Sequence, residues 1–144
     1  MPITVSSYSK GPSAADEGLR CAVVTPIGPG HELLAEDSAE SVAAAFDRNA
    51  GPFSDIDIIR VDDTQGLLGR SEARNCGVRE AGRLGAEWIF FLDADDLMHP
   101  DAFGAMTAYH REYDAVWGLI CELAPDEEGY VEREGQVREI ERPE

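Results

Sequence analysis

Apolar residues follow two alternating patterns along this chain. Short, mostly apolar runs occupy residues 21–27, 55–61, 87–92 and 114–123. Between these runs, apolar residues return every three or four positions, which is the spacing of one face of a helix. Near-continuous apolar strands are typical of a parallel sheet that is covered on both faces. The pattern therefore predicts an α/β fold in which buried strands alternate with amphipathic helices.

Glycine and proline residues set the ends of three predicted helices. The first helix is predicted over 31–48, where the sequence Asn-Ala-Gly-Pro follows directly. The second is predicted over 70–84, with Gly85 as its terminator. The third is predicted over 100–111, because proline suits the first turn of a helix. We expect each helix to connect two consecutive strands.

The two ends of the chain do not follow this alternation. Residues 1–20 are rich in Ser, Gly, Pro and Ala, and we expect a mostly flexible N-terminal segment there. Residues 21–144 are expected to form one domain, a three-layer α/β sandwich with a mostly parallel central sheet. Near its end, a turn is expected at 125–129 and a short hairpin at 130–140.

Polar residues stand at or near the carboxyl ends of three predicted strands. Carboxyl ends of parallel strands meet at one edge of the sheet, and ligands bind outside that edge in such folds. We therefore expect these side chains to form one site. The residues are Thr25, Asp62, Asp63, Asp93, Asp95 and Asp96.

The run WIFFLDADDLMHP at 88–100 is the most acidic of these strand ends. Converging carboxylates repel one another unless a cation lies among them, and carboxylate oxygens suit Mg²⁺ or Mn²⁺. Asp95 with Asp93 or Asp96 could hold a metal that bridges a nucleotide diphosphate and neutralises charge on the leaving group. The alternative is an acidic turn that caps the helix beginning near Pro100. The spacing alone leaves both interpretations open.

Net charge and cysteine content argue against several classes of partner and site. The net charge is −17, from 29 acidic and 12 basic residues, which argues against nucleic acid or an anionic membrane as the main partner. Three scattered cysteines (Cys21, Cys76 and Cys121) fit a reducing compartment and neither a zinc site nor a disulfide framework. No signal-peptide pattern is visible at the N-terminus. We expect a cytoplasmic location, or one peripheral to the inner face of a membrane.

Four segments of the chain together resemble a known family. They are VVTPIGPGHE, IDIIRVDDTQG, GRSEARNCGVREA and WIFFLDADDLMHPDAF, and they occur in this order. The ordered set resembles the first half of a family 2 glycosyltransferase of the GT-A (Rossmann-like) fold. In that family a Thr/Pro loop, a DDxS loop, an ARNxG helix and a DxD loop follow one another. The resemblance covers roughly residues 21–121.

The resemblance assigns a role to each polar residue at the predicted edge. It implies a nucleotide-sugar site with a divalent metal, Mn²⁺ or Mg²⁺, as cofactor. For Arg74 a solvated helix face, or a structural bond to the aspartate loops, remains an alternative. The implied roles are contact with the nucleobase for Thr25, a hydrogen bond to the base (usually uracil) for Asp63 or Asp62, lining of the nucleotide pocket for Arg70 and Arg74, approach to the ribose for Asp93, and metal ligation for Asp95 or Asp96.

The implied activity is inverting transfer of a hexose-type sugar, expected from a UDP-sugar, to an acceptor that the sequence does not identify (a sugar, a lipid or a protein). The family places its acceptor site and catalytic base in a second half. This chain resembles the donor-binding half alone, so we expect an apparently truncated GT-A domain. A fragment of a longer enzyme is favoured over a degenerate relative or a short form that needs a partner. No catalytic base and no oligomeric state are predicted.

Three alternatives stay open on the same residues. A non-catalytic module would bind a nucleotide sugar without transferring it. IFFLDADDLM also resembles the first motif of haloacid-dehalogenase-type phosphohydrolases, but Lys10 is the sole lysine and the motif comes late in the chain. A nucleotidyltransferase would need a Gly-rich, lysine-containing first loop. The segment IGPGH also stands where the family often has YN, which leaves the preferred base open.

Overall fold

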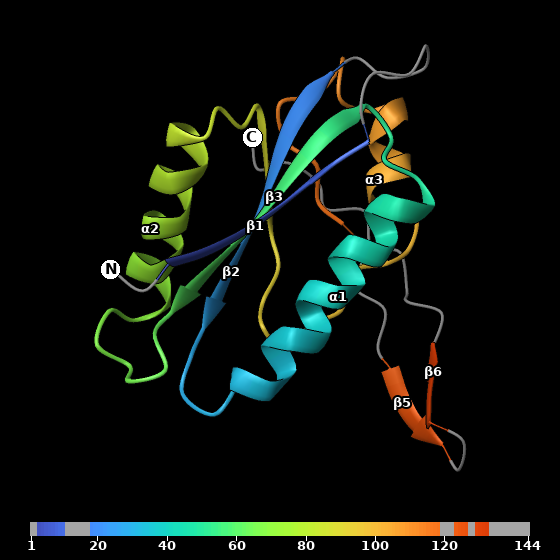
Figure 1. Cartoon of the computed structure of the whole chain (residues 1–144). Helices are drawn as coiled ribbons and strands as arrows, with labels where there is room; N and C mark the ends of the chain where they lie inside the picture. The colour runs from blue at the N-terminus through green and yellow to red at the C-terminus, as the bar shows by residue number, and fades with distance from the viewer. Residues whose placement is uncertain (1–2, 11–17, 119–122, 127–128, 133–144) are drawn as a thin grey trace, which may run out of the picture. The chain divides into compact units, whose positions relative to one another are not determined.

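The computed structural model describes residues 3–10, 18–118, 123–126 and 129–132. Two compact units are formed, by Met1–Glu112 and by Tyr113–Glu144. In the described residues, the first unit contains a four-stranded sheet with its helices, and the second contains a two-stranded hairpin (Figure 1).

The sheet of the first unit has the strand order β1-β3-β2-β4. Strand β2 is parallel to β3 and to β4, whereas β1 is antiparallel to β3. The predicted mostly parallel sheet is therefore confirmed. The strands are β1 Ile3–Ser9, β2 Leu19–Ile27, β3 Phe53–Asp62 and β4 Trp88–Phe91.

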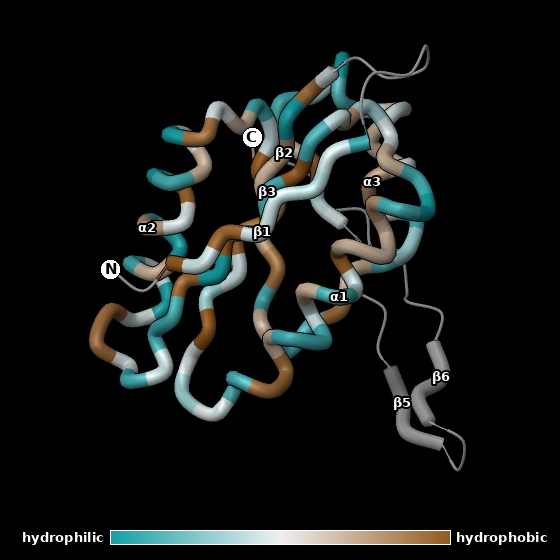
Figure 2. The backbone as a smooth tube through the Cα atoms, in the orientation of Figure 1, coloured by the Kyte–Doolittle hydropathy of each residue, from teal (hydrophilic) through white to brown (hydrophobic). Residues whose placement is uncertain are grey.

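Two long helices cover opposite faces of this sheet (Figure 1). Helix α1, Glu32–Arg48, packs on the face that carries Val23, and helix α2, Arg70–Arg83, packs on the face that carries Val24. Successive strand residues point to opposite faces, so one apolar run supplies both cores. Polar and apolar residues are mixed along both helices in Figure 2. The result is the predicted three-layer sandwich. Within the described part of the chain, no helix is long and apolar enough to cross a membrane.

The core beneath α1 is built on edge-to-face aromatic contacts. Phe103 lies 5.3 Å from Phe90 and 6.0 Å from both Phe46 and Phe53, measured between ring centroids. Phe103 is fully buried and belongs to the short helix α3, Ala102–Ala105. Each such pair stabilises the fold by about 0.5–1.5 kcal/mol beyond the area that it buries.

The predicted helix over 100–111 is shorter in the structure. It consists of α3 and a 3₁₀ turn, η1 Met106–Ala108. Phe103 and Met106 are both buried and are three residues apart, which suits the three-residue turn of a 3₁₀ helix. Gly104 and Thr107 have low helix propensity, which weakens a continuous α-helix over this segment.

The prediction that residues 1–20 are mostly flexible is wrong for Ile3–Ser9, which form β1, and for the start of β2. Ile3 and Val5 pack against the core on the α2 face, and the strand pairs with β3 along its whole length. Only Ile3 and Val5 follow the alternation that marks a half-buried strand, and Ser7 stands at the next position of that face, so the pattern is too short to be recognised.

The predicted strand over 114–123 is wrong for residues 114–118, which form no strand. Trp117 is 86% exposed there, so its apolar ring is not part of a core. The hairpin of the second unit is formed by β5, Leu123–Asp126, and β6, Gly129–Glu132, which pair in antiparallel. It lies earlier than the hairpin predicted over 130–140, whose last eight residues are outside the described part.

An ion pair and a hydrogen bond to the buried Asp57 join β1, β2 and β3 away from the acidic end of the sheet. Asp57 has no exposed surface and accepts hydrogen bonds from Arg20 Nε at 2.8 Å, Arg20 Nη2 at 3.0 Å and Ser7 Oγ at 2.6 Å. Burial alone would raise the pKa of Asp57. The bonds from Arg20 and Ser7 outweigh burial, so the pKa lies below its usual value.

We expect Asp57→Asn to destabilise the protein by about 1.5–3 kcal/mol at neutral pH, the usual contribution of a hydrogen bond to a charged group. Because the folded pKa is depressed, this stabilisation is present above the unfolded value of about 3.9 and disappears as the pH falls through the folded pKa. Urea unfolding at pH 7 and at progressively lower pH should show the difference between wild type and variant shrinking on acidification. A constant difference would contradict the account.

Candidate functional site

The carboxyl ends of β2, β3 and β4 lie at one edge of the sheet. Ile27 of β2 pairs with Asp62 of β3, and Val24 pairs with Phe91 of β4. Because β2 lies between the other two, the loops after β3 and β4 are separated by two strand spacings, about 10 Å. Thr25 lies between them in β2 and is 2% exposed. The strand ends that carry the predicted polar residues therefore lie at one edge of the sheet.

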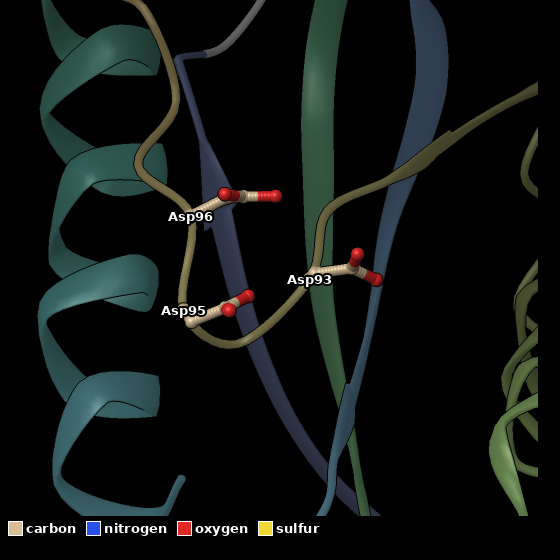
Figure 3. A group of neighbouring side chains, drawn as sticks. All are labelled: Asp93, Asp95 and Asp96. Carbon is tan, nitrogen blue, oxygen red and sulfur yellow. The ribbon is translucent and has the colours of Figure 1, made fainter. Parts of the chain in front are cut away.

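The loop after β4 gathers three carboxylates. One oxygen from each of Asp93, Asp95 and Asp96 lies within 4.8 Å of the others (Figure 3). Asp95 and Asp96 are exposed, and Asp93 is partly buried. The set could therefore hold a cation on its solvent-facing side.

Backbone hydrogen bonds fix this loop at both ends and within its turn. Leu92 N donates to Val24 O at 3.1 Å, and Asp96 N donates to Asp93 O at 3.0 Å. Met98 N donates to Ser41 Oγ of α1 at 2.9 Å. The carboxylates therefore belong to a loop that is tied to both the sheet and a helix. Such a tied loop limits the reorganisation needed to bind a ligand.

The electrostatics of the cluster favour a bound cation. Burial raises the pKa of Asp96, and the neighbouring charges of Asp95 and Asp93 raise it further. A divalent ion would reverse this effect, because its charge stabilises the ionised carboxylates. The donor set, three hard carboxylate oxygens, is the kind that Mg²⁺ and Mn²⁺ prefer. The residues present therefore fit the metal that the sequence led us to expect.

The cluster does not cap the following helix. Helix α3 begins at Ala102, its N-cap residue is Asp101, and no side chain makes a capping hydrogen bond. The alternative explanation of the acidic run, a capping turn, therefore loses its support for Asp93, Asp95 and Asp96.

Of the two predicted arginines, the structure brings one to the cluster. Arg74 Nη2 donates to Asp93 Oδ1 at 2.7 Å, and both side chains are partly exposed. This is the structural bond to the aspartate loop that the sequence left open. Arg70 is exposed at the first position of α2 and forms no ion pair with any described residue. Arg74 thus positions Asp93 and reduces the repulsion within the cluster.

Close packing of α2 on the sheet brings Arg74 to this place. A Cβ atom at Gly77 would lie 2.3 Å from Val24 Cγ1, so only glycine permits this helix-to-sheet distance. Gly77 is buried, and Arg74 lies one turn before it on the same helix. A larger residue at position 77 would move the guanidinium away from Asp93.

Asp62 and Asp63 have different environments although they are adjacent. Asp63 is 7% exposed, and its two carboxylate oxygens accept hydrogen bonds from Leu68 N at 2.9 Å and Gly69 N at 3.0 Å. Asp63 therefore holds the loop that leads into α2. Asp62 is exposed, and the bond from Thr64 N at 3.0 Å lowers the pKa of its carboxyl group.

A pocket of about 220 Å³ lies beside Asp62, on the α1 face of the sheet. Most of its lining residues were not singled out from the sequence. Alternation along β3 could have found Arg60, which shares a face with Asp62, and helical spacing could have found Glu32 and Glu36. The lining residues are Thr4, Ile27, Glu32, Ala35, Glu36, Arg60, Asp62 and Thr64.

Comparison with protein families gives one match. The family model described as Glycosyl transferase family 2 matches residues 35–138, more than half of the chain. Searches of curated proteins and of solved structures found no match. Family membership implies a nucleotide-sugar donor and an acceptor, and enzymes of this family commonly use a divalent metal. On the strength of this match, the chain belongs to glycosyltransferase family 2.

Proposed function

We propose that this chain binds a nucleoside diphosphate sugar at the carboxyl edge of its sheet and forms the donor site for sugar transfer. The observation that carries the proposal is the cluster of Asp93, Asp95 and Asp96, whose oxygens lie within 4.8 Å of one another. The cluster lies across β2 from Asp62 and its pocket. A ribose and a diphosphate would bridge these two places.

Asp95 and Asp96 are the proposed metal ligands, for Mn²⁺ or Mg²⁺. A bound metal of this type supplies Lewis-acid stabilisation of the negative charge on a departing nucleoside diphosphate. Asp93 is proposed to face the ribose, oriented by its bond from Arg74. Arg70, exposed at the start of α2, would extend toward the phosphates as a second cation.

Asp62 is the proposed partner of the nucleobase. It lines the pocket and is exposed, and a carboxylate accepts the N–H of a keto base such as uracil. Asp63 would affect nucleotide binding only indirectly, by holding the loop that leads into α2. Thr25 is 2% exposed and would contact the base only from the floor of the site. The transferred group is proposed to be a hexose-type sugar, passed with inversion to a sugar, lipid or protein acceptor.

The division of work between the two aspartates can be tested with two matched variants. Asp62→Asn should weaken binding of UDP or GDP in Mn²⁺ by roughly tenfold or more, because a charge-assisted hydrogen bond contributes about 1.5–3 kcal/mol. It should leave the unfolding temperature nearly unchanged. Asp63→Asn should lower the unfolding temperature, because it weakens the bonds to Leu68 and Gly69.

Calorimetry and thermal unfolding of both variants give the two readouts. Asp63, and not Asp62, would be the partner of the nucleobase if Asp63→Asn bound nucleotide poorly while keeping the wild-type unfolding temperature, and Asp62→Asn bound nucleotide normally.

A further inference from the structure

Arg60, one of the residues that line the pocket beside Asp62, has no hydrogen-bond partner among the described residues. Arg60 Nε has no surface accessible to solvent and no hydrogen-bond partner. Among the residues that the structure describes, Arg60 forms no ion pair either, although it lies on β3 two residues before Asp62. An unpaired guanidinium costs free energy, and because Nε is buried, the terminal nitrogens of Arg60 are the donors that a ligand in the pocket could reach.

The other polar groups of the pocket are mostly acceptors. Glu32 and Glu36 come from the first turns of α1 and are spaced to share one helix face, and Asp62 comes from the end of β3. Thr4 and Thr64 add hydroxyl groups. The pocket therefore presents one guanidinium and three carboxylates to whatever it holds, and a matching ligand needs an acceptor edge beside several N–H donors.

Among the common nucleobases, guanine offers this combination with the most N–H donors, whereas cytosine has adjacent acceptors, O2 and N3, but only its N4–H₂ group as a donor. The O6 and N7 atoms of guanine are adjacent acceptors that an arginine pairs with through two N–H groups, and its N1–H and N2–H₂ groups donate to a carboxylate. Uracil offers a single N–H donor. Adenine places a donor, N6–H₂, beside N7, so an arginine cannot pair with both positions.

We propose that Arg60 selects guanine in this pocket, with the pocket carboxylates accepting the N–H groups of the base, so that the donor is a guanosine diphosphate sugar. This inference rests on the proposed donor site, and it replaces the uracil that the family resemblance favours. It assigns a specificity-determining role to Arg60, a residue that no part of the sequence resemblance singled out.

The test is calorimetric titration of GDP and, separately, UDP into the full chain with Mn²⁺. Wild type is expected to bind GDP at least roughly fivefold more tightly than UDP, the lower end of the discrimination given by a two-bond arginine contact. Arg60→Gln should lose this preference while keeping its affinity for UDP. Arg60→Lys, which keeps the charge but not the planar fork, should also lose most of it.

Arg83→Gln is the matched control. Arg83 is exposed at the end of α2 and pairs with Glu80, outside the pocket, so its replacement should leave the preference intact. Thermal unfolding verifies that each variant is folded. If Arg60→Gln does not fold, the result from Arg60→Lys decides.

Three results would overturn the proposal in distinguishable ways. Equal or tighter binding of UDP by wild type, in the presence of Mn²⁺, would remove guanine selection and leave the donor site standing. A preference for GDP that survives the Arg60 variants would remove Arg60 as its cause. Absence of nucleotide binding to wild type would overturn both this inference and the proposed function.

Discussion

Replacement of Asp95 by asparagine is expected to abolish the Mn²⁺-dependent part of nucleotide binding. Asp95 is exposed in the acidic cluster, and its substitution removes a negative charge and a hard oxygen ligand together. Loss of an outer-shell partner already costs roughly 10–100-fold in metal affinity, so loss of a direct ligand should cost more. Electron paramagnetic resonance of Mn²⁺, titrated with protein and nucleotide, measures the bound fraction directly.

The matched control for this variant is Asp37→Asn. Asp37 is an exposed aspartate of α1 that lies outside the acidic cluster and the pocket, so its replacement changes the net charge equally. The control should bind Mn²⁺ and nucleotide as wild type does. Equal losses in the two variants would show that only overall charge matters, and the assignment of Asp95 as a ligand would be wrong.

Gly51→Ala is expected to cause the largest loss of stability among single substitutions considered in the first unit. Gly51 has a φ of +57°, and an added Cβ would lie 2.0 Å from the backbone oxygen of Phe103. A backbone carbonyl cannot move as a side chain does, and Phe103 is fully buried in the aromatic core. Left-handed strain of about 1–2 kcal/mol adds to overpacking of about 1–3 kcal/mol. Urea unfolding should show a loss of about 2–5 kcal/mol.

Gly85→Ala separates the two causes. Gly85 has a φ of +84° and would meet nothing within 4 Å, so its replacement incurs the backbone strain without the clash. Gly85→Ala should lower the free energy of unfolding by only about 1–2 kcal/mol. Equal losses at the two positions would mean that the contact with Phe103 does not constrain the fold.

The elements that the sequence predicted well are those with strong periodicity. Strands β2 and β3 and helices α1 and α2 were placed within two residues of their observed ends, because buried strands and amphipathic helices leave clear hydrophobic patterns. Strand β1 was missed, since an edge strand needs few apolar residues. The apolar run at 114–118 was misassigned, because hydrophobicity alone does not show that a segment has a surface to pack on.

The sequence predicted where the candidate site lies better than it predicted what each residue does there. The position of Asp93, Asp95 and Asp96 after a buried strand was enough to predict that they converge. The sequence did not show which of Asp62 and Asp63 is exposed and which holds the loop. That difference depends on which face of the sheet each side chain meets once the loop is folded. Alternation along β3 places Arg60 on the same face as Asp62, but only the packing of α1 shows that this face is lined by a pocket.

Metal-dependent nucleotide binding at the acidic edge is the central property of the proposed donor site. The measurement that tests it is calorimetric titration of GDP and of UDP into the wild-type chain, with Mn²⁺ and with the metal removed by EDTA. The account predicts saturable binding of at least one nucleotide in Mn²⁺ and its loss, or a large weakening, in EDTA. Equal affinity under both conditions, or no binding under either, would contradict it.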